Sequence, residues 1–164
     1  MEEVRGGSPP RPRLKVLEVC DALNSTGARY LVIGGIACIL HGYVRATTDI
    51  DILIERTLEN VGRVLAGLCQ TGYGFARDWS PAEILSRPVT VIGDDPAVDI
   101  FLVAWTLEYE HAVTRASVVR VGNVEVPLIG LDDLIATKRT GRALDASDVE
   151  ALEHIRRYHG GSAT

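Results

Sequence analysis

The stretch that decides the fold is Thr48-Asp49-Ile50-Asp51-Ile52-Leu53-Ile54 (residues 48–54), in which aspartates and isoleucines alternate. Because successive side chains of a β-strand point to opposite faces, we expect the three isoleucines to face the core and both aspartates to share the other face. Their Cα atoms would then lie about 6.5–7 Å apart. Two unpaired like charges on a strand repel each other, and a divalent cation removes that repulsion. The stretch therefore predicts a strand whose two carboxylates hold metal ions, with a solvent-facing edge strand as the alternative.

A third carboxylate has a similar setting. Residues 98–103 read Val-Asp-Ile-Phe-Leu-Val, which places Asp99 within an otherwise apolar strand. If this strand neighbours the first one, Asp99 completes a three-carboxylate cluster. Such a cluster can bind two Mg²⁺ or Mn²⁺ ions about 3.5–4 Å apart, and in-line nucleotidyl transfer depends on that charge neutralisation. A structural salt bridge is the alternative role for Asp99.

Two glycines precede the aspartate pair. Gly34-Gly35 follows the apolar strand expected at 30–33 and precedes a short helix expected at 36–41. Backbone amides with no Cβ in the way can cradle a phosphate, although two glycines at the end of a strand often form a simple turn. The pair becomes informative through its short distance in sequence to Asp49 and Asp51.

The rest of the chain alternates between helical and strand patterns. Gly122-Asn123 is typical of a hairpin turn, and Thr57 is expected to cap a helix with one apolar stripe at positions 58, 61, 65 and 68. The pattern predicts an α/β (α+β) fold, a mixed β-sheet with flanking helices and two C-terminal helices. The expected helices are 14–25, 36–41, a helix after 57, 131–140 and 145–158, and the expected strands are 30–33, 49–55, 89–92, 98–103, 115–121 and 124–128.

Length and composition limit the possible functions. The 164 residues are enough for one domain, expected at 14–159, between a disordered tail at 1–13 and a frayed tail at 160–164. The net charge of −5 argues against a general DNA-coat role, although a local basic patch can still hold RNA.

The longest apolar stretch, 30–40, is too short to span a bilayer. The 3 cysteines indicate reduced core thiols and a cytoplasmic location. Asp94 and Asp95 lie in a Gly/Pro turn and are expected to be solvated.

Taken together, these motifs resemble the DNA polymerase beta-like nucleotidyltransferase superfamily, which has a Gly-Gly or Gly-Ser pair, a spacer of about ten residues, Asp-x-Asp, and a later strand Asp. The longer string from Gly34 to Asp51 is similar to stand-alone prokaryotic proteins related to abortive-infection toxin nucleotidyltransferases. The later segment from Leu131 to Val149 also matches them, so the resemblance covers roughly residues 30–152. It implies the nucleotidyltransferase fold and transfer of a nucleoside monophosphate from a nucleoside triphosphate (NTP), with Asp49 and Asp51 as metal ligands and Asp99 as third ligand or base.

Further residues are candidates for substrate binding. Arg45 and Thr48 lie in the loop before the aspartate strand, where Arg45 would contact a phosphate or pair with a carboxylate. Lys138 and Arg142, at i and i+4, are expected on one helix face; the resemblance implies that Lys138 lies near the triphosphate, and an ordinary charged surface helix is the alternative.

Asp145 and Asp148 are more ambiguous, because they stand where a helix N-cap and its N3 partner would be. Capping is one explanation for them. A role as the acceptor-side base is the other, and it is implied only by the toxin relatives.

Three functions remain open at this point. The first is a Mg²⁺-dependent enzyme that modifies RNA or a protein, with an antitoxin or other protein as partner. The second keeps the chemistry and modifies a small molecule, as antibiotic-modifying relatives do. The third is a catalytically silent nucleotide- or partner-binding module, because a fold does not guarantee activity.

Overall fold

The computed structural model describes residues 12–160. Most of the predicted N-terminal tail and residues 161–164 of the predicted C-terminal one lie outside this range. Helix α1 (Pro12–Ser25) begins two residues before the expected start of the domain. Among the described residues, no helix is both long and apolar enough to cross a membrane.

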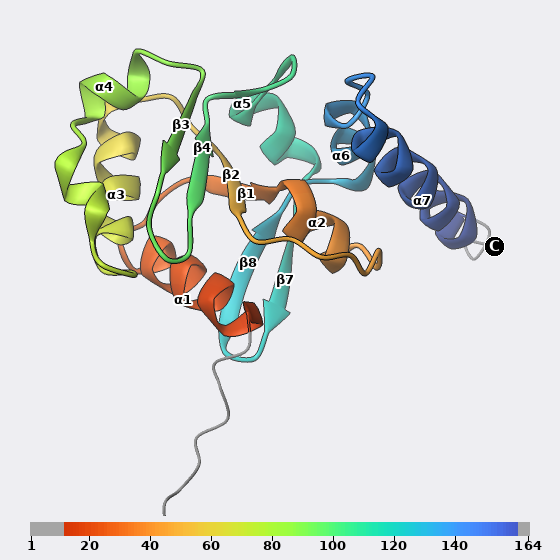
Figure 1. The fold of residues 1–164 in the computed structure, drawn as a ribbon, viewed down its shortest axis with the longest axis horizontal. Coiled ribbons are helices and arrows are strands. Elements are labelled where there is room, and N and C mark those ends of the chain that lie inside the picture. Colours follow the sequence, from red (N-terminus) through yellow and green to blue (C-terminus); the bar gives the residue numbers. More distant parts are fainter. Residues whose placement is uncertain (1–11, 161–164) are drawn as a thin grey trace, which may run out of the picture.

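A six-stranded mixed sheet forms the centre of the fold, as predicted (Figure 1). Strand β2 lies between β1, to which it is antiparallel, and β4, to which it is parallel. Strand β1 also pairs in parallel with β8, and the outer strands β3 and β7 are antiparallel to their neighbours. In spatial order the strands are β3 (Val89–Ile92), β4 (Val98–Phe101), β2 (Ile50–Ile54), β1 (Tyr30–Ile33), β8 (Val124–Leu128) and β7 (Ser117–Val121).

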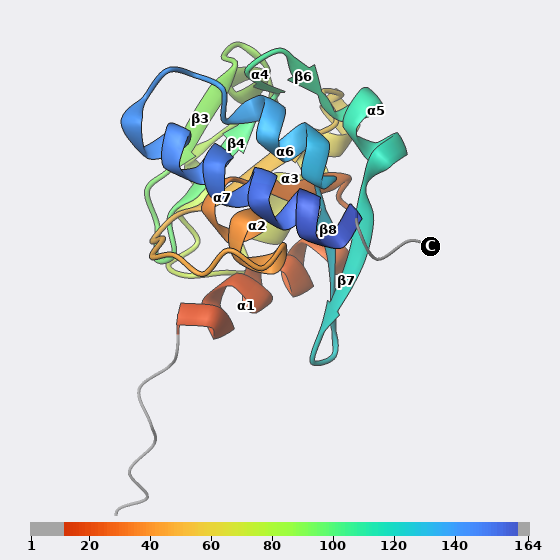
Figure 2. The same ribbon diagram turned by 90° about the vertical axis from the view of Figure 1, so that its right-hand side faces the viewer.

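Helices cover both faces of the sheet. Helices α1 and α3 (Leu58–Leu68) lie on one face, and α2 (Gly34–Leu40), α6 (Leu131–Thr137) and α7 (Ala143–Gly160) lie on the other (Figures 1 and 2). Shorter elements complete the fold: η1 (Phe75–Asp78), α4 (Pro81–Leu85), β5 (Val103–Ala104), β6 (Leu107–Glu108), α5 (Tyr109–Ala112) and η2 (Val113–Arg115).

The core follows the apolar pattern of the sequence with one exception. All four residues of β1 are buried, and so are the three isoleucines of β2. Thr57 caps α3 as predicted, because its Oγ1 accepts a hydrogen bond of 3.1 Å from the backbone N–H of Asn60. Leu58 was wrongly placed in the buried stripe: it is 66% exposed, because the first residue of α3 precedes the turn that meets the core.

Several boundaries differ from those expected. Helix α6 ends at Thr137, Lys138 is its C-cap, and α7 begins at Ala143, so the two C-terminal helices meet at a break over 138–142. Gly141 takes a positive φ of 84° in that break, which favours glycine. Cys69 is exposed, unlike Cys20 and Cys38, so it is not the core thiol that the sequence suggested.

Asp94 also corrects an expectation, because it does not simply face solvent. Its carboxylate accepts hydrogen bonds from the backbone N–H groups of Tyr73 (2.8 Å), Phe75 (3.0 Å) and Asp95 (2.7 Å). Slight burial favours the neutral acid, but these bonds outweigh it and lower the pKa of Asp94. The interaction fastens the 72–75 loop to the turn that leads into β4.

We therefore expect Asp94→Ala to lower the free energy of unfolding by about 1–2 kcal/mol at pH 7, because three backbone donors lose their acceptor. A carboxyl whose pKa is lowered by folding stabilises the protein above its ordinary pKa, and this contribution is lost as the pH falls through the folded-state value. The difference between the variant and the wild type should therefore shrink as the pH falls below the ordinary aspartate pKa, near 4.

The matched control is Asp95→Ala, which removes only an exposed ion pair with Lys15 and should change stability by less than about 0.5 kcal/mol. Urea unfolding at several pH values measures both variants. Equal destabilisation by the two substitutions would contradict the role given to Asp94.

Candidate functional site

The sheet register places two of the predicted carboxylates side by side. In the parallel β2–β4 pair, the Cα of Asp51 is the direct partner of the Cα of Asp99, so both side chains lie on the face that α2 covers. The expectation that their strands are neighbours is confirmed. Oδ1 of Asp99 is buried and has no hydrogen-bond partner.

The carboxylates of Asp51 and Asp99 lie in an environment that disfavours their ionisation. Burial raises the pKa of Asp51 to about 7; the charge of Asp99 adds to the rise and the charge of Lys138 opposes it. Burial also raises the pKa of Asp99, with a further contribution from the charge of Asp49. Like charges held close together in a half-buried position favour a bound cation.

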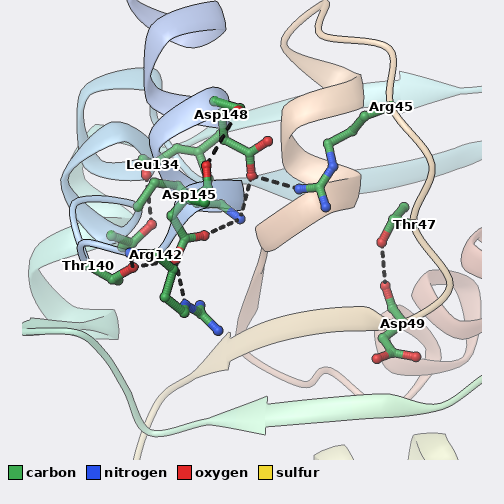
Figure 3. Close-up of polar contacts among 12 residues, drawn as sticks. Arg45, Thr47, Asp49, Leu134, Thr140, Arg142, Asp145 and Asp148 are labelled. Carbon is green, nitrogen blue, oxygen red and sulfur yellow. Dashed lines mark hydrogen bonds and ion pairs between the residues drawn. The ribbon is translucent and has the colours of Figure 1, made fainter.

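Asp49 immediately precedes β2 and is exposed. The Thr48 hydroxyl donates a hydrogen bond of 3.3 Å to its Oδ1, and the Thr47 hydroxyl donates one of 3.4 Å to its backbone oxygen (Figure 3). Within residues 12–160, no three Asp, Glu, His or Cys side chains are gathered closely enough to hold a metal ion. Asp51 and Asp99 thus form a pair, and Asp49 influences them through its charge.

Gly34 lies against Asp51, and Gly35 lies against Thr47. A Cβ on Gly34 would lie 2.0 Å from Oδ2 of Asp51, and one on Gly35 would lie 2.7 Å from Oγ1 of Thr47. Gly34 also has a positive φ of 67°. Only glycine allows the backbone of α2 to approach the carboxylates so closely.

A second group of charges lies beside the pair and is centred on α7. The Asp148 side chain is completely buried, and its Oδ2 lies 2.7 Å from Nη1 of Arg45 and 3.1 Å from Nζ of Lys138. Its Oδ1 has no hydrogen-bond partner. Figure 3 shows Arg45 reaching from the α2–β2 loop toward Asp148. Arg45 therefore pairs with a carboxylate, but not with one of the three on the strands.

Asp145 completes this group. Its carboxylate accepts a hydrogen bond from the Thr140 hydroxyl and another, of 2.8 Å, from Nε of Arg142, and Nζ of Lys138 lies 3.7 Å from it. Burial opposes its ionisation, but the bonds from Thr140 and Arg142 dominate and lower the pKa of Asp145. Arg45, Lys138, Arg142, Asp145 and Asp148 are called the Asp148 cluster below.

This geometry corrects two expectations. Lys138 and Arg142 do not share a helix face, because α6 ends before Lys138; the Lys138 side chain is 14% exposed and that of Arg142 78% exposed. The capping explanation for Asp145 and Asp148 is also wrong, because both lie inside α7 and their carboxylates bind side chains from other segments.

A signal for this cluster is present in the sequence, in the spacing of its acidic residues. Asp145, Asp148 and Leu152 follow the i, i+3, i+7 spacing of one buried helix face, and they are 3%, 0% and 0% exposed. Carboxylates on an apolar stripe require partners, and the basic residues of 138–142 supply some of them.

A cavity of about 480 Å³ lies elsewhere, between Tyr43 and the His154 side of α7. None of its lining residues belongs to the carboxylate pair or to the Asp148 cluster. The carboxylate pair and the Asp148 cluster therefore lie outside this cavity.

Two solved structures resemble this fold. A nucleotidyltransferase-like antigenic protein from Paracoccidioides brasiliensis superposes with a TM-score of 0.55 at 13% identity, covering 85% of this chain and 73% of that one. A protein classed as a nucleotidyltransferase from Thermotoga maritima superposes with a TM-score of 0.53 at 18% identity, covering 96% of this chain and 99% of that one. At these identities the similarity shows the fold alone.

No curated protein matches the sequence. The sequence model of the aminoglycoside-2''-adenylyltransferase family matches residues 15–153, which include both strand carboxylates and the whole Asp148 cluster. The chain belongs to the aminoglycoside-2''-adenylyltransferase family and has a nucleotidyltransferase fold.

Proposed function

We propose that this protein transfers a nucleoside monophosphate from an NTP, in the first instance ATP, to a hydroxyl group of a small molecule. One observation carries the proposal: Asp51 and Asp99 lie side by side on the sheet, directly against the Gly34 backbone. The family description favours a small-molecule acceptor over the macromolecule that the toxin resemblance implies.

The carboxylates fit a divalent cation. Asp51 and Asp99 supply the hard oxygen ligands that Mg²⁺ and Mn²⁺ prefer, and the buried Oδ1 of Asp99 lacks a partner. Asp49, whose charge already acts on both, is the third ligand we propose. When bound, such cations neutralise the charge that develops on the triphosphate. Closing the three carboxylates around them requires Asp49 to move inward.

The remaining residues bind and orient the substrate. We assign Gly34 and Gly35 to the phosphates, because the lack of a Cβ lets the start of α2 lie against Asp51 and Thr47, and Thr48 offers a hydroxyl just before β2. Lys138 acts on Asp51 through its charge and is the buried cation nearest to the pair, so we assign it to the triphosphate. Arg45 holds Asp148 and thereby positions Lys138, which differs from the direct phosphate contact expected from the sequence.

The reaction follows from this placement. The acceptor oxygen forms a bond to the α-phosphorus while the bond between that phosphorus and the α–β bridging oxygen breaks, and pyrophosphate leaves. We assign the hydroxyl proton to the carboxylate of Asp99, which lies beside Asp51 and whose pKa is raised by burial. The carboxylates of Asp145 and Asp148 form ion pairs that hold Arg45, Lys138 and Arg142 in place, and we assign them no proton transfer.

A transfer assay tests the function. With α-³²P-labelled ATP, Mg²⁺ and kanamycin, the wild type should produce a labelled aminoglycoside, and Asp51→Asn should lower the rate by roughly 10²-fold or more, because the charge-stabilising ligand is lost. Asp95→Asn, at an exposed carboxylate, is the control and should retain the wild-type rate.

The same assay separates the competing functions. Label in RNA or protein from a cell lysate, with none in kanamycin, would support the macromolecular reaction and the toxin–antitoxin setting. Mg²⁺-dependent binding of ATP without transfer to any acceptor would support a silent binding module. Equal rates for the wild type and Asp51→Asn would contradict the site.

The electrostatic strain at Asp51 makes a separate prediction about stability. Folding raises the pKa of Asp51 to about 7, so the folded state favours the neutral acid, and in the metal-free protein stability is lost as the pH rises from the ordinary carboxyl range, near 4, toward 7. Asp51→Asn removes the charge and should therefore raise the melting temperature at pH 8 but hardly change it at pH 4.

Thermal unfolding in the presence of a chelator measures this effect. Asp95→Asn, which carries no buried charge, should give the same small shift at both pH values. A lower melting temperature for Asp51→Asn at pH 8 would show that the carboxylate is satisfied in the metal-free fold.

A further inference from the structure

The α2 face of the sheet becomes more exposed from β1 toward the edge strand β3. Cross-strand partners share a face, so Ile33, Asp51, Asp99 and Val91 form one row across the four strands. Ile33 is 4% exposed, whereas Val91, at the other end of the row, is 56% exposed.

The next row shows the same trend. It contains Leu31, Leu53, Phe101 and Val89 in the same strand order. The first two are 2% and 0% exposed, Phe101 is half-buried, and Val89 is 38% exposed. Val89, Val91 and Phe101, called the Val91 strip below, therefore form an apolar surface directly beside Asp99.

The in-line geometry of phosphoryl transfer indicates which substrate covers this strip. Gly34 begins α2 and lies against Asp51, and Lys138 ends α6, which packs against α2, so the triphosphate and its leaving pyrophosphate belong on the α2 and β1 side of Asp51. In phosphoryl transfer the attacking and leaving oxygens lie roughly in line with the phosphorus. The acceptor hydroxyl must therefore approach from the opposite side, which along this row is the side of β3.

We propose that the Val91 strip is the acceptor subsite, on which the C–H face of a polyhydroxylated ring packs while its hydroxyl reaches Asp99. Sugar and cyclitol rings present such apolar faces, and their hydroxyl and ammonium groups would then meet the carboxylates of Asp49 and Asp99. Val91 thereby determines acceptor specificity and contributes nothing to nucleotide binding. This inference rests on the proposed function.

The test compares two exposed valines on the two edge strands of the sheet. Val91→Arg blocks the strip, and Val118→Arg makes the same change on β7, where the valine is 63% exposed. Because both positions are exposed, both variants should fold, which thermal unfolding checks.

We expect Val91→Arg to raise the KM for kanamycin about tenfold, in proportion to the lost apolar contact, and to leave the KM for ATP unchanged. Val118→Arg should change neither, and Val91→Ile should retain the wild-type KM.

The contrary outcomes are distinct. If Val91→Arg behaves like Val118→Arg, the strip is not the acceptor subsite. If Val91→Arg raises the KM for ATP instead, a nucleobase occupies the strip and the inference is overturned, although the proposed function stands.

If the wild type transfers nothing to kanamycin, the small-molecule function fails. The assignment of the strip to an acceptor fails with it, and calorimetric titration of Mg·ATP into Val91→Arg then tests only whether the strip lies outside the nucleotide site. Unchanged ATP affinity keeps the strip outside the nucleotide site, and lost affinity places it inside.

Discussion

The whole site depends on the close approach of the Gly34 backbone to Asp51. A Cβ at position 34 would lie 2.0 Å from the carboxylate, so the β1–α2 junction and the second residue of β2 are fixed relative to each other at atomic contact. The antiparallel β1–β2 register sets this distance, and the parallel β2–β4 register then adds Asp99 beside Asp51. Two ladders of backbone hydrogen bonds thus place the glycine backbone and the paired negative charge next to each other, while the buried isoleucines on the opposite face hold the strands in register.

The local part of this arrangement could be predicted from the sequence. The alternation in 48–54 identifies both the strand and the face of its aspartates, and the Gly34-Gly35 pair marks where the backbone must pass close by. The neighbouring position of Asp99 was a conditional expectation, because periodicity does not reveal strand order. The Asp148 cluster was predictable only in part. The spacing of Asp145, Asp148 and Leu152 marks one buried helix face, but Arg45 and Asp148 are separated by 103 positions, and only the tertiary fold shows which basic residues meet the two aspartates.

The break between α6 and α7 was predicted, but its position was not. Two C-terminal helices were expected, the first ending at residue 140; in the structure Lys138 already caps α6, and Gly141 takes a positive φ in the break. The spacing of apolar residues does not reveal this earlier end. With Lys138 outside the helix, its ammonium lies 3.1 Å from Oδ2 of Asp148 in α7, an ion pair between two segments that no local pattern encodes.

Asp148 and the proposed triphosphate compete for the one positive charge of Lys138. In the structure its ammonium neutralises Asp148, a fully buried carboxylate whose other cation among the described residues is Arg45. A triphosphate that draws the same ammonium toward itself weakens the contact that holds α7 to the end of α6. Nucleotide occupancy and the docking of the C-terminal helix are then thermodynamically linked, so each must alter the free energy of the other by the same amount. Any molecule that clamps α7 in place would, by this linkage, act as an effector of nucleotide affinity without touching the nucleotide.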